Sequence, residues 1–200
     1  MLEPKSPRRP FGIPAPIREE PVADVARLRI ALVEVIPPVW RRIRVPVHVT
    51  FRRLHPILQC AMGWPESEEH QFRIGDIAYG KPEETDATLR DSRWVRLADV
   101  IGLGRNSFVY AIGPESLWEH EVRIETVLSG NPDNQRPMCL EGERACPPEG
   151  CPGPEAYVEH AARRRESSRR ARAGAEKARP AFDPDTFDLD SINRRLSWQR

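Results

Sequence analysis

The sequence lacks the features that mark membrane, secreted and nucleotide-dependent proteins. It has no run of about 18 apolar residues, so no transmembrane helix is expected. Its opening, MLEPKSPRRPFGIPAP, has no apolar core of the kind found in signal peptides. No phosphate-binding loop and no G-x-G-x-x-G, G-x-S-x-G or kinase motif is present. These absences predict a cytoplasmic protein without a membrane partner and disfavour nucleotide enzymes and serine hydrolases.

An excess of charge of one sign is also missing. Lys and Arg number 31 and Asp and Glu number 30, which leaves a formal net charge of +1. A chain-wide attraction to nucleic acid or to an anionic membrane is therefore absent, although a local patch can still form. Cysteines are few, four in 200 residues, and in a reducing compartment they are expected to be thiols or metal ligands.

Proline, in contrast, is abundant and clusters in two places. Residues 1–22 hold six prolines and predict a flexible tail, because proline fixes φ and removes a backbone donor. Residues 131–155 hold six more prolines and three of the four cysteines, with no apolar periodicity, and predict a long irregular loop. The chain from 23 to 200 is expected to be a single domain at this length.

Between these segments the apolar periodicity predicts paired strands and one main helix. Pro37-Pro38 separates the first two strands, and Trp40 is expected to anchor the second one in the core. Thr50 is a candidate N-cap for the main helix, and Gly63 is a natural end for it. The expected strands are 27–36, 39–47, 70–79, 107–112 and 118–128, and the expected helices are 50–64, 96–103 and 156–179.

Hairpins rather than β-α-β units predict the fold class, a compact α+β domain of antiparallel hairpins packed with one main helix. The irregular loop over 131–155 is followed by a C-terminal helix over 156–179, which is rich in Ala and Arg. An acidic and aromatic segment over 180–200 ends the chain.

Four stretches occur in an order that is similar to a known family. They are ALVEVIPPVWRRIRVP at 31–46, LHPILQCAMGW at 54–64, FVYAIGPESLWEHEVRIE at 108–125 and CLEGERACPPEGCPGPEAY at 139–157. Together they resemble the plasmid pRiA open-reading-frame-three-like family, also described as insertion-element passenger proteins. The resemblance spans about residues 27–196 and implies a compact α+β domain associated with plasmids and mobile elements. It implies no particular reaction, and so favours a non-enzymatic binding or accessory protein.

Five aromatic and histidine side chains are candidates for a binding pocket. Trp118 and His120 share one face of a strand, and a Trp beside a His can line a pocket in which the imidazole is an acid, a base or a ligand. With a nearby carboxylate, the same cluster leaves open a metal-dependent hydrolase or nuclease. The alternative is a hydrogen-bonded core histidine. The candidates are Trp64, His70, Tyr110, Trp118 and His120.

The cysteines of the irregular loop are candidates for a structural zinc site. Zinc takes four Cys and His ligands, and a bound metal would hold a loop that has no regular structure. Cys139, Cys146 and Cys151 would supply three ligands, and His120 or His160 the fourth. The spacing C-x6-C-x4-C differs from the tight C-x2-C of zinc ribbons. The alternative is that prolines and packing fix the loop and that the cysteines are ordinary thiols.

The C-terminal helix is a candidate nucleic-acid interface. Its cations can follow a phosphate backbone, although no aromatic residue is interleaved with them. The aspartates of 180–200 offer the alternative, because they can fold back and neutralise the helix. The partner is thus an unknown protein or a nucleic acid. The candidate contacts are Arg163, Arg164, Arg165, Arg169, Arg170 and Arg172.

Overall fold

A computed structural model describes residues 24–64, 69–82, 89–113, 118–131, 135–148, 150–173 and 182–199, with residues 170–173 described by their backbone alone. The predicted proline-rich tail, 1–22, and the end of the predicted helix, 174–179, lie outside these ranges. The strands are β1 (Val25–Leu32), β2 (Trp40–Pro46), β3 (His70–Ile74), β4 (Ile77–Gly80), β5 (Arg90–Asp91), β6 (Ser107–Ile112), β7 (Trp118–Leu128) and β8 (Met138–Glu143). The helices are α1 (Phe51–Met62), α2 (Leu97–Gly102), α3 (Pro154–Ala173) and α4 (Leu189–Leu196).

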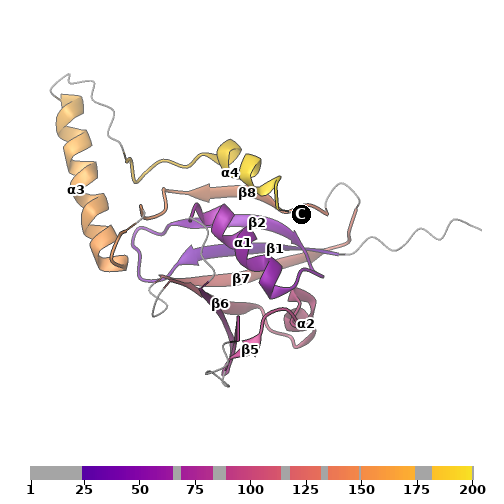
Figure 1. The fold of residues 1–200 in the computed structure, drawn as a ribbon. Helices are drawn as coiled ribbons and strands as arrows, with labels where there is room; N and C mark the ends of the chain where they lie inside the picture. Colours follow the sequence, from indigo (N-terminus) through magenta and orange to yellow (C-terminus); the bar gives the residue numbers. More distant parts are fainter. Residues whose placement is uncertain are drawn as a thin grey trace, which may run out of the picture.

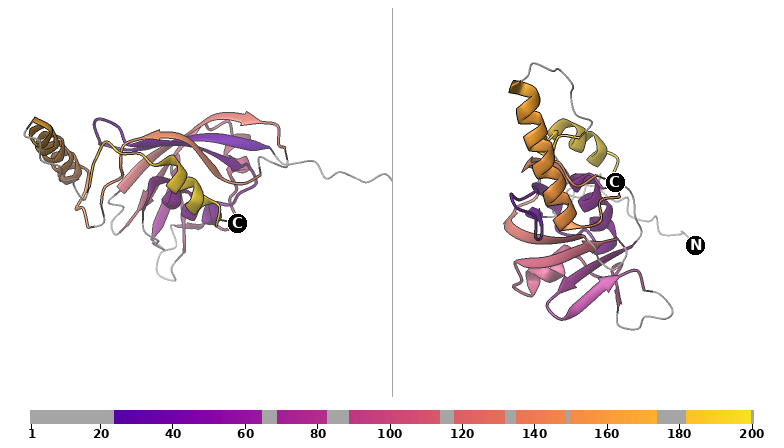
Figure 2. Two further views of the ribbon diagram at one scale, coloured as in Figure 1. Left: turned by 90° about the horizontal axis from the view of Figure 1, so that it is seen from above. Right: turned by 90° about the vertical axis from the view of Figure 1, so that its left-hand side faces the viewer.

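The described strands form one sheet in the order β5-β4-β3-β6-β7-β1-β2-β8. Neighbouring strands are antiparallel except for the short β4–β5 pair, which is parallel. Helix α1 crosses the middle of the sheet, and α4 lies beside it over β8 (Figure 1). Seen from above, both helices lie under the same face of the curved sheet (Figure 2). The architecture confirms the predicted α+β class and its antiparallel hairpins.

The core lies between α1 and the inner face of the sheet. Alternate residues of each central strand point inward, so Leu28 and Ile30 of β1 are fully buried with Val122 of β7. The ring of Phe51, at the start of α1, lies 4.5 Å from that of Phe72 on β3. This packing fixes the position of α1, and with it the side chains that α1 presents at its two ends.

Local sequence signals set the limits of α1. The hydroxyl of Thr50 accepts a hydrogen bond from the backbone N–H of Arg53, as an N-cap does. Gly63 ends the helix with a φ of 91°, a left-handed conformation that glycine adopts without a side-chain clash. Both expectations for this helix are thus met.

The predicted strand over 70–79 is instead a hairpin of two strands, β3 and β4. Gly75 has a φ of 57°, and this left-handed residue turns the chain between Ile74 and Ile77. The two strands keep the period of two on each side of the turn, which is why the apolar pattern runs through it without a break.

The predicted irregular loop over 131–155 contains a strand, β8, which extends the sheet beyond β2. Its pairing depends on Gly142, because a Cβ at that position would lie 2.7 Å from the carbonyl oxygen of Trp40. The amide of Asn193 in α4 also bonds both the N–H and the C=O of Cys139. The strand is therefore stabilised by contacts that are distant in sequence, and its own apolar pattern is weak.

The expectation that Trp40 anchors β2 in the core is wrong. Trp40 lies half-buried on the outer face of the sheet, where the guanidinium carbons of Arg29 and Arg42 lie 5.0 and 5.5 Å from its ring centroid. The inward position next to it belongs to Arg41, because residues 41, 43 and 45 share one face of the strand.

Candidate functional site

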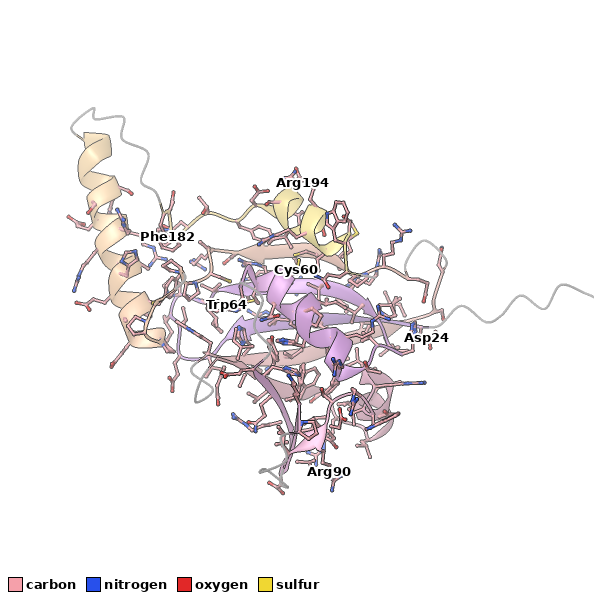
Figure 3. All side chains as sticks on the ribbon, in the orientation of Figure 1. Asp24, Cys60, Trp64, Arg90, Phe182 and Arg194 are labelled. Atoms are coloured by element: carbon pink, nitrogen blue, oxygen red, sulfur yellow. The ribbon has the colours of Figure 1, made fainter. Side chains whose placement is uncertain are left out.

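The five predicted pocket residues do gather in one place, at the C-terminal end of α1 and the facing strands β3, β6 and β7. Trp64 lies just past that end of α1 (Figure 3), and its ring centroid is 5.3 Å from that of Trp118. The rings of Tyr110 and His120 are 5.2 Å apart. His70 joins the group through His55 of α1, on which its ring stacks.

His120 is the best-defined member, with no exposed surface. The indole N–H of Trp64 donates to its Nε2 at 3.0 Å, and its Nδ1 lies 3.0 Å from the carbonyl oxygen of Tyr110. An indole N–H only donates and a carbonyl only accepts, so the ring is neutral with its proton on Nδ1. Burial lowers the pKa of His120 to about 4. Both ring nitrogens are thus already used.

Tyr110 connects this histidine to a second pair. Its hydroxyl lies 2.8 Å from Nδ1 of His55, and burial raises its pKa well above the ordinary value. The ring of His55 stacks on that of His70 at 3.9 Å, and Nε2 of His70 lies 3.5 Å from the hydroxyl of Ser92. The result is a chain of polar groups between α1 and the sheet.

This row of hydrogen-bonded polar groups supports a structural role better than a catalytic one. Tyr110 and His120 are fully buried, Trp118 is nearly so, and only Trp64 and His70 are half-buried. A buried polar group that is fully hydrogen-bonded stabilises one arrangement of the core, whereas an unpaired one is costly. The predicted residues are therefore close together, but His120, Tyr110 and His70 each have a hydrogen-bond partner inside the protein.

The predicted zinc ligands are not brought together. His120 is on β7 and Cys139 is on β8, with β1 and β2 between them in the sheet. The thiol of Cys139 contacts the carbonyl of Glu141, and that of Cys151 contacts the carbonyl of Gly153. Throughout the described ranges there is no group of three His, Cys, Asp or Glu side chains that could hold a metal. His160, the other candidate ligand, packs against the ring of Phe182 instead.

Burial disfavours the thiolate form of Cys60, Cys139 and Cys146. Burial raises the pKa of Cys139 and of Cys146 to about 11, and it also raises that of Cys60. A thiol needs its thiolate form to act as a nucleophile or metal ligand. This arrangement agrees with the alternative in which the cysteines are ordinary thiols.

A buried arginine that no sequence motif indicates holds the segment after β8. Arg41 is 3% exposed, and its guanidinium donates to the carbonyls of Ala61, Trp40, Glu143 and Arg144 at 2.7 to 3.2 Å. It also lies 3.7 Å from the sulfur of Cys146 and 4.8 Å from the ring centroid of Phe187. Arg41 therefore joins β2, the end of α1 and the chain leaving β8, the task that a metal was expected to perform.

The basic helix α3 is partly neutralised, as the alternative for it predicted. Arg163 pairs with Glu159 on the same helix, and Arg165 pairs with Asp185 at 2.9 Å. The candidate side chains of Arg170 and Arg172 lie outside the described residues. Arg164 and Arg169 form no ion pair with a described carboxylate. Helix α3 stands to one side of the sheet (Figure 2).

A feature that sequence reasoning missed lies at the opposite end of α1. A groove of about 560 Å³ runs between the first turns of α1, residues 135–137 before β8, and the end of α4. We call it the basic groove. Its cationic lining residues are Arg52, Arg53 and Arg136, His48 also lines it, and the described residues that line it include no Asp or Glu.

The three arginines of the basic groove are exposed. Arg52, Arg53 and Arg136 form no ion pair with any carboxylate of the described chain. The charge of Arg52 lowers the pKa of Asp91 only as a minor contribution, after that of Arg93. The apolar part of the lining consists of Pro46, Val49, Pro56, Ile57, Pro137 and Leu196.

No sequence motif marks this groove, because its residues come from three distant segments. Arg52 and Arg53 belong to the main helix, whereas Arg136 falls in the segment that the sequence predicts to be an irregular loop. The one usable signal was that α1 has no acidic residue in its first turn, where carboxylates are favoured.

The fold and these sites together define an α+β protein with a mainly antiparallel sheet and a covered inner face. The family model of plasmid pRiA4b ORF-3-like proteins matches residues 24–191, and the chain belongs to that family. The uncharacterised protein y4hQ of Sinorhizobium fredii is 39% identical over 140 residues, which are 69% of this chain and 72% of that protein.

A solved structure has the same fold. The crystal structure of the protein of unknown function MM3350 from Methanosarcina mazei Go1 matches with a TM-score of 0.70 and 26% identity. The match covers 84% of this chain and 97% of that one. In the described part of this chain, every helix is too short or too polar to cross a lipid bilayer.

Proposed function

We propose that this chain is a non-enzymatic binding protein, accessory to plasmids or mobile elements, and that its ligand is an anion held in the basic groove. One observation carries the proposal: arginines from two separate segments meet at one groove with no carboxylate in the described lining. In a chain whose total charge is nearly zero, such a concentration of one sign is a local feature.

The field in the groove favours anions over neutral ligands. Arg52 and Arg53 come from α1, and Arg136 faces them from the chain before β8. Because a guanidinium is always charged and presents several N–H donors, it suits carboxylate and phosphate oxygens. The three arginines line one concave surface, and charges closer than about one Debye length, roughly 10 Å at 0.1 M salt, are screened only in part, so that their contributions add.

The side chains, and not the helix terminus, form this site. The backbone N–H of Phe51 donates to the carbonyl of Val95, and that of Arg52 donates to the carbonyl of Ser92. The N–H of Arg53 is bonded to Thr50. These donors are therefore not available to a ligand, and removal of arginine side chains should abolish binding.

The test is calorimetric titration of the protein with tripolyphosphate, a compact anion, at low ionic strength. We expect measurable binding, and the double variant R53Q/R136Q should weaken it by about tenfold, because each arginine–anion pair contributes a fraction of a kcal/mol to about 1 kcal/mol. Both residues are exposed, so the variant should unfold at the same temperature as the parent.

The control is R90Q/R105Q, which removes the same charge from exposed positions elsewhere. Arg90 is on the short edge strand β5, at the opposite edge of the sheet from α4 and its Arg194 (Figure 3). The affinity of this control for tripolyphosphate should stay within about twofold of the parent. Absence of binding by the parent, or an equal loss in both double variants, would overturn the proposal.

A further inference from the structure

We infer that the anion of the basic groove is a single-stranded nucleic acid, with its phosphates on the arginines and a base stacked on Trp198. This inference rests on the proposed function and adds the class of ligand. Two observations carry it: a cationic groove with no carboxylate in its described lining, and an unusually exposed tryptophan that is next in the chain to two lining residues.

Trp198 is 84% exposed, although an indole gains more from burial than most side chains. It follows α4 directly, and the residues on either side of it, Ser197 and Gln199, both line the groove. The backbone N–H of Trp198 donates to the carbonyl of Arg195, which holds this part of the chain on the last turn of the helix. The ring is therefore adjacent in the chain to two lining residues of the groove and is not packed against the core.

A second exposed tryptophan belongs to a segment that contacts the start of α1. Trp94 is 79% exposed and belongs to a segment that crosses the start of α1. On either side of it, the carbonyl of Ser92 accepts from the N–H of Arg52, and that of Val95 accepts from Phe51. The segment that carries the exposed indole of Trp94 thus lies beside the first turn of α1.

Tryptophans beside cations are the recognition elements of single strands. Arginines neutralise the phosphates, and each aromatic face stacks on a base whatever its identity. The proline and aliphatic part of the groove lining offers a dry surface for further bases, while Ser197 and Gln199 offer polar groups to base edges. A duplex keeps its bases stacked on one another, so it cannot use the indole faces in this way.

The positive charge of the groove alone would also suit an acidic peptide, but the exposed indoles favour the bases of a nucleic acid. An acidic peptide gains from the cations and has no planar group that requires two open aromatic faces. Helix α3 is a separate cationic surface and has no aromatic residue among its arginines, so stacking should depend on Trp198 and not on α3.

The experiment is fluorescence anisotropy with a labelled oligo-dT of about twelve nucleotides and a duplex of equal length, over a series of salt concentrations. The W198A variant should bind the single strand about tenfold more weakly, since stacking of one base on an aromatic ring is of that size. W198F should keep most of the affinity. The R53Q/R136Q variant should lower the slope of log K against log salt by about 1.4, because each phosphate that an arginine no longer neutralises reduces the slope by about 0.7.

The matched control for the tryptophan is I36A, which removes an equally exposed apolar side chain from the turn between β1 and β2. It should bind like the parent. Tripolyphosphate binding distinguishes the proposed anion site from the single-strand inference. W198A should leave this binding unchanged, because the small anion needs only the arginines.

The binding results distinguish failure of the single-strand inference from failure of the proposed function. Binding of tripolyphosphate without binding of oligo-dT, or equal binding of oligo-dT by W198A and the parent, overturns the single-strand inference and leaves the proposed function standing. Stronger binding of the duplex, or competition by poly-glutamate but not by oligo-dT, also overturns it. Loss of binding in R164Q/R169Q but not in R53Q/R136Q would place the site on α3. If neither anion binds, both proposals fail.

Discussion

Acidification should destabilise this protein through His120, whose neutral ring is enclosed in the core. The ring accepts from the indole of Trp64 and donates to the carbonyl of Tyr110. Protonation would remove the acceptor and leave a buried cation facing an N–H group. The native state therefore resists the proton, which is why burial lowers the pKa of His120 to about 4.

The magnitude follows from the two pKa values. In the unfolded chain the histidine titrates at its ordinary value of 6.5, so between pH 6.5 and 4 only the unfolded state binds the proton. Stability is then fully present above pH 6.5 and falls as the pH is lowered, because the state that takes up protons is favoured. Each unit of difference between the two pKa values corresponds to about 1.4 kcal/mol. The titration of this one ring therefore lowers the free energy of unfolding by about 2 kcal/mol at pH 5 and by about 3 kcal/mol at pH 4.

The assay is urea unfolding at pH 7, 6, 5 and 4.5 for the parent and for His120→Gln. Glutamine can also accept from Trp64 and donate to a carbonyl, but it does not titrate. We expect the variant to be the less stable at pH 7, because its amide fits the site imperfectly, and the gap to close by about 2 kcal/mol at pH 5. All other groups titrate in both proteins and cancel in the difference. A gap that stays constant with pH would refute the reasoning.

Two further predictions concern the strand that the sequence pattern missed. Arg41→Lys should lower the free energy of unfolding by about 3 kcal/mol, because an ammonium group cannot reach four carbonyls from one position, whereas Arg42→Lys on the outer face should cost about 1 kcal/mol or less. Thermal melts of both variants check this, and equal losses would contradict it. Gly142→Ala should cost about 2 kcal/mol by chemical denaturation, since its Cβ would lie 2.7 Å from the carbonyl oxygen of Trp40. Gly102→Ala, which meets nothing within 4 Å, should be neutral or slightly stabilising, and a loss there as large as at Gly142 would argue against the steric explanation.

The parts of the fold that the sequence predicted are those governed by local periodicity. The hairpins β1–β2 and β6–β7 and the limits of α1 follow from alternation, a cap at Thr50 and a stop at Gly63. The membership of the polar cluster was also predictable, because Trp118 and His120 share a strand face. The contacts of His55 with Tyr110 and His70 were not predictable in detail, since a histidine inside an amphipathic helix carries no signal of its partner.

The missed parts depend on residues that are distant in sequence. Strand β8 exists because β2 has a free edge and because α4 bonds its backbone through Asn193. For Arg41, two rules give opposite answers. The alternation of the strand places it on the inner face with Ile43, whereas its charge favours an exposed position. The inward position wins because four backbone carbonyls converge there, and no local pattern reveals that convergence.

The basic groove arises from the way in which an almost neutral chain distributes its charges. On the outer face of the sheet, Glu119, Glu121, Glu125 and Glu141 each pair with an arginine from a strand of the same sheet. Those carboxylates already have arginine partners on the sheet, although exposed pairs of this kind contribute little to stability. The arginines at the start of α1 and before β8 then meet with no carboxylate in the described lining. Local charge of one sign thus follows from strand pairing and not from composition, and a net charge of +1 is fully compatible with an anion-binding surface.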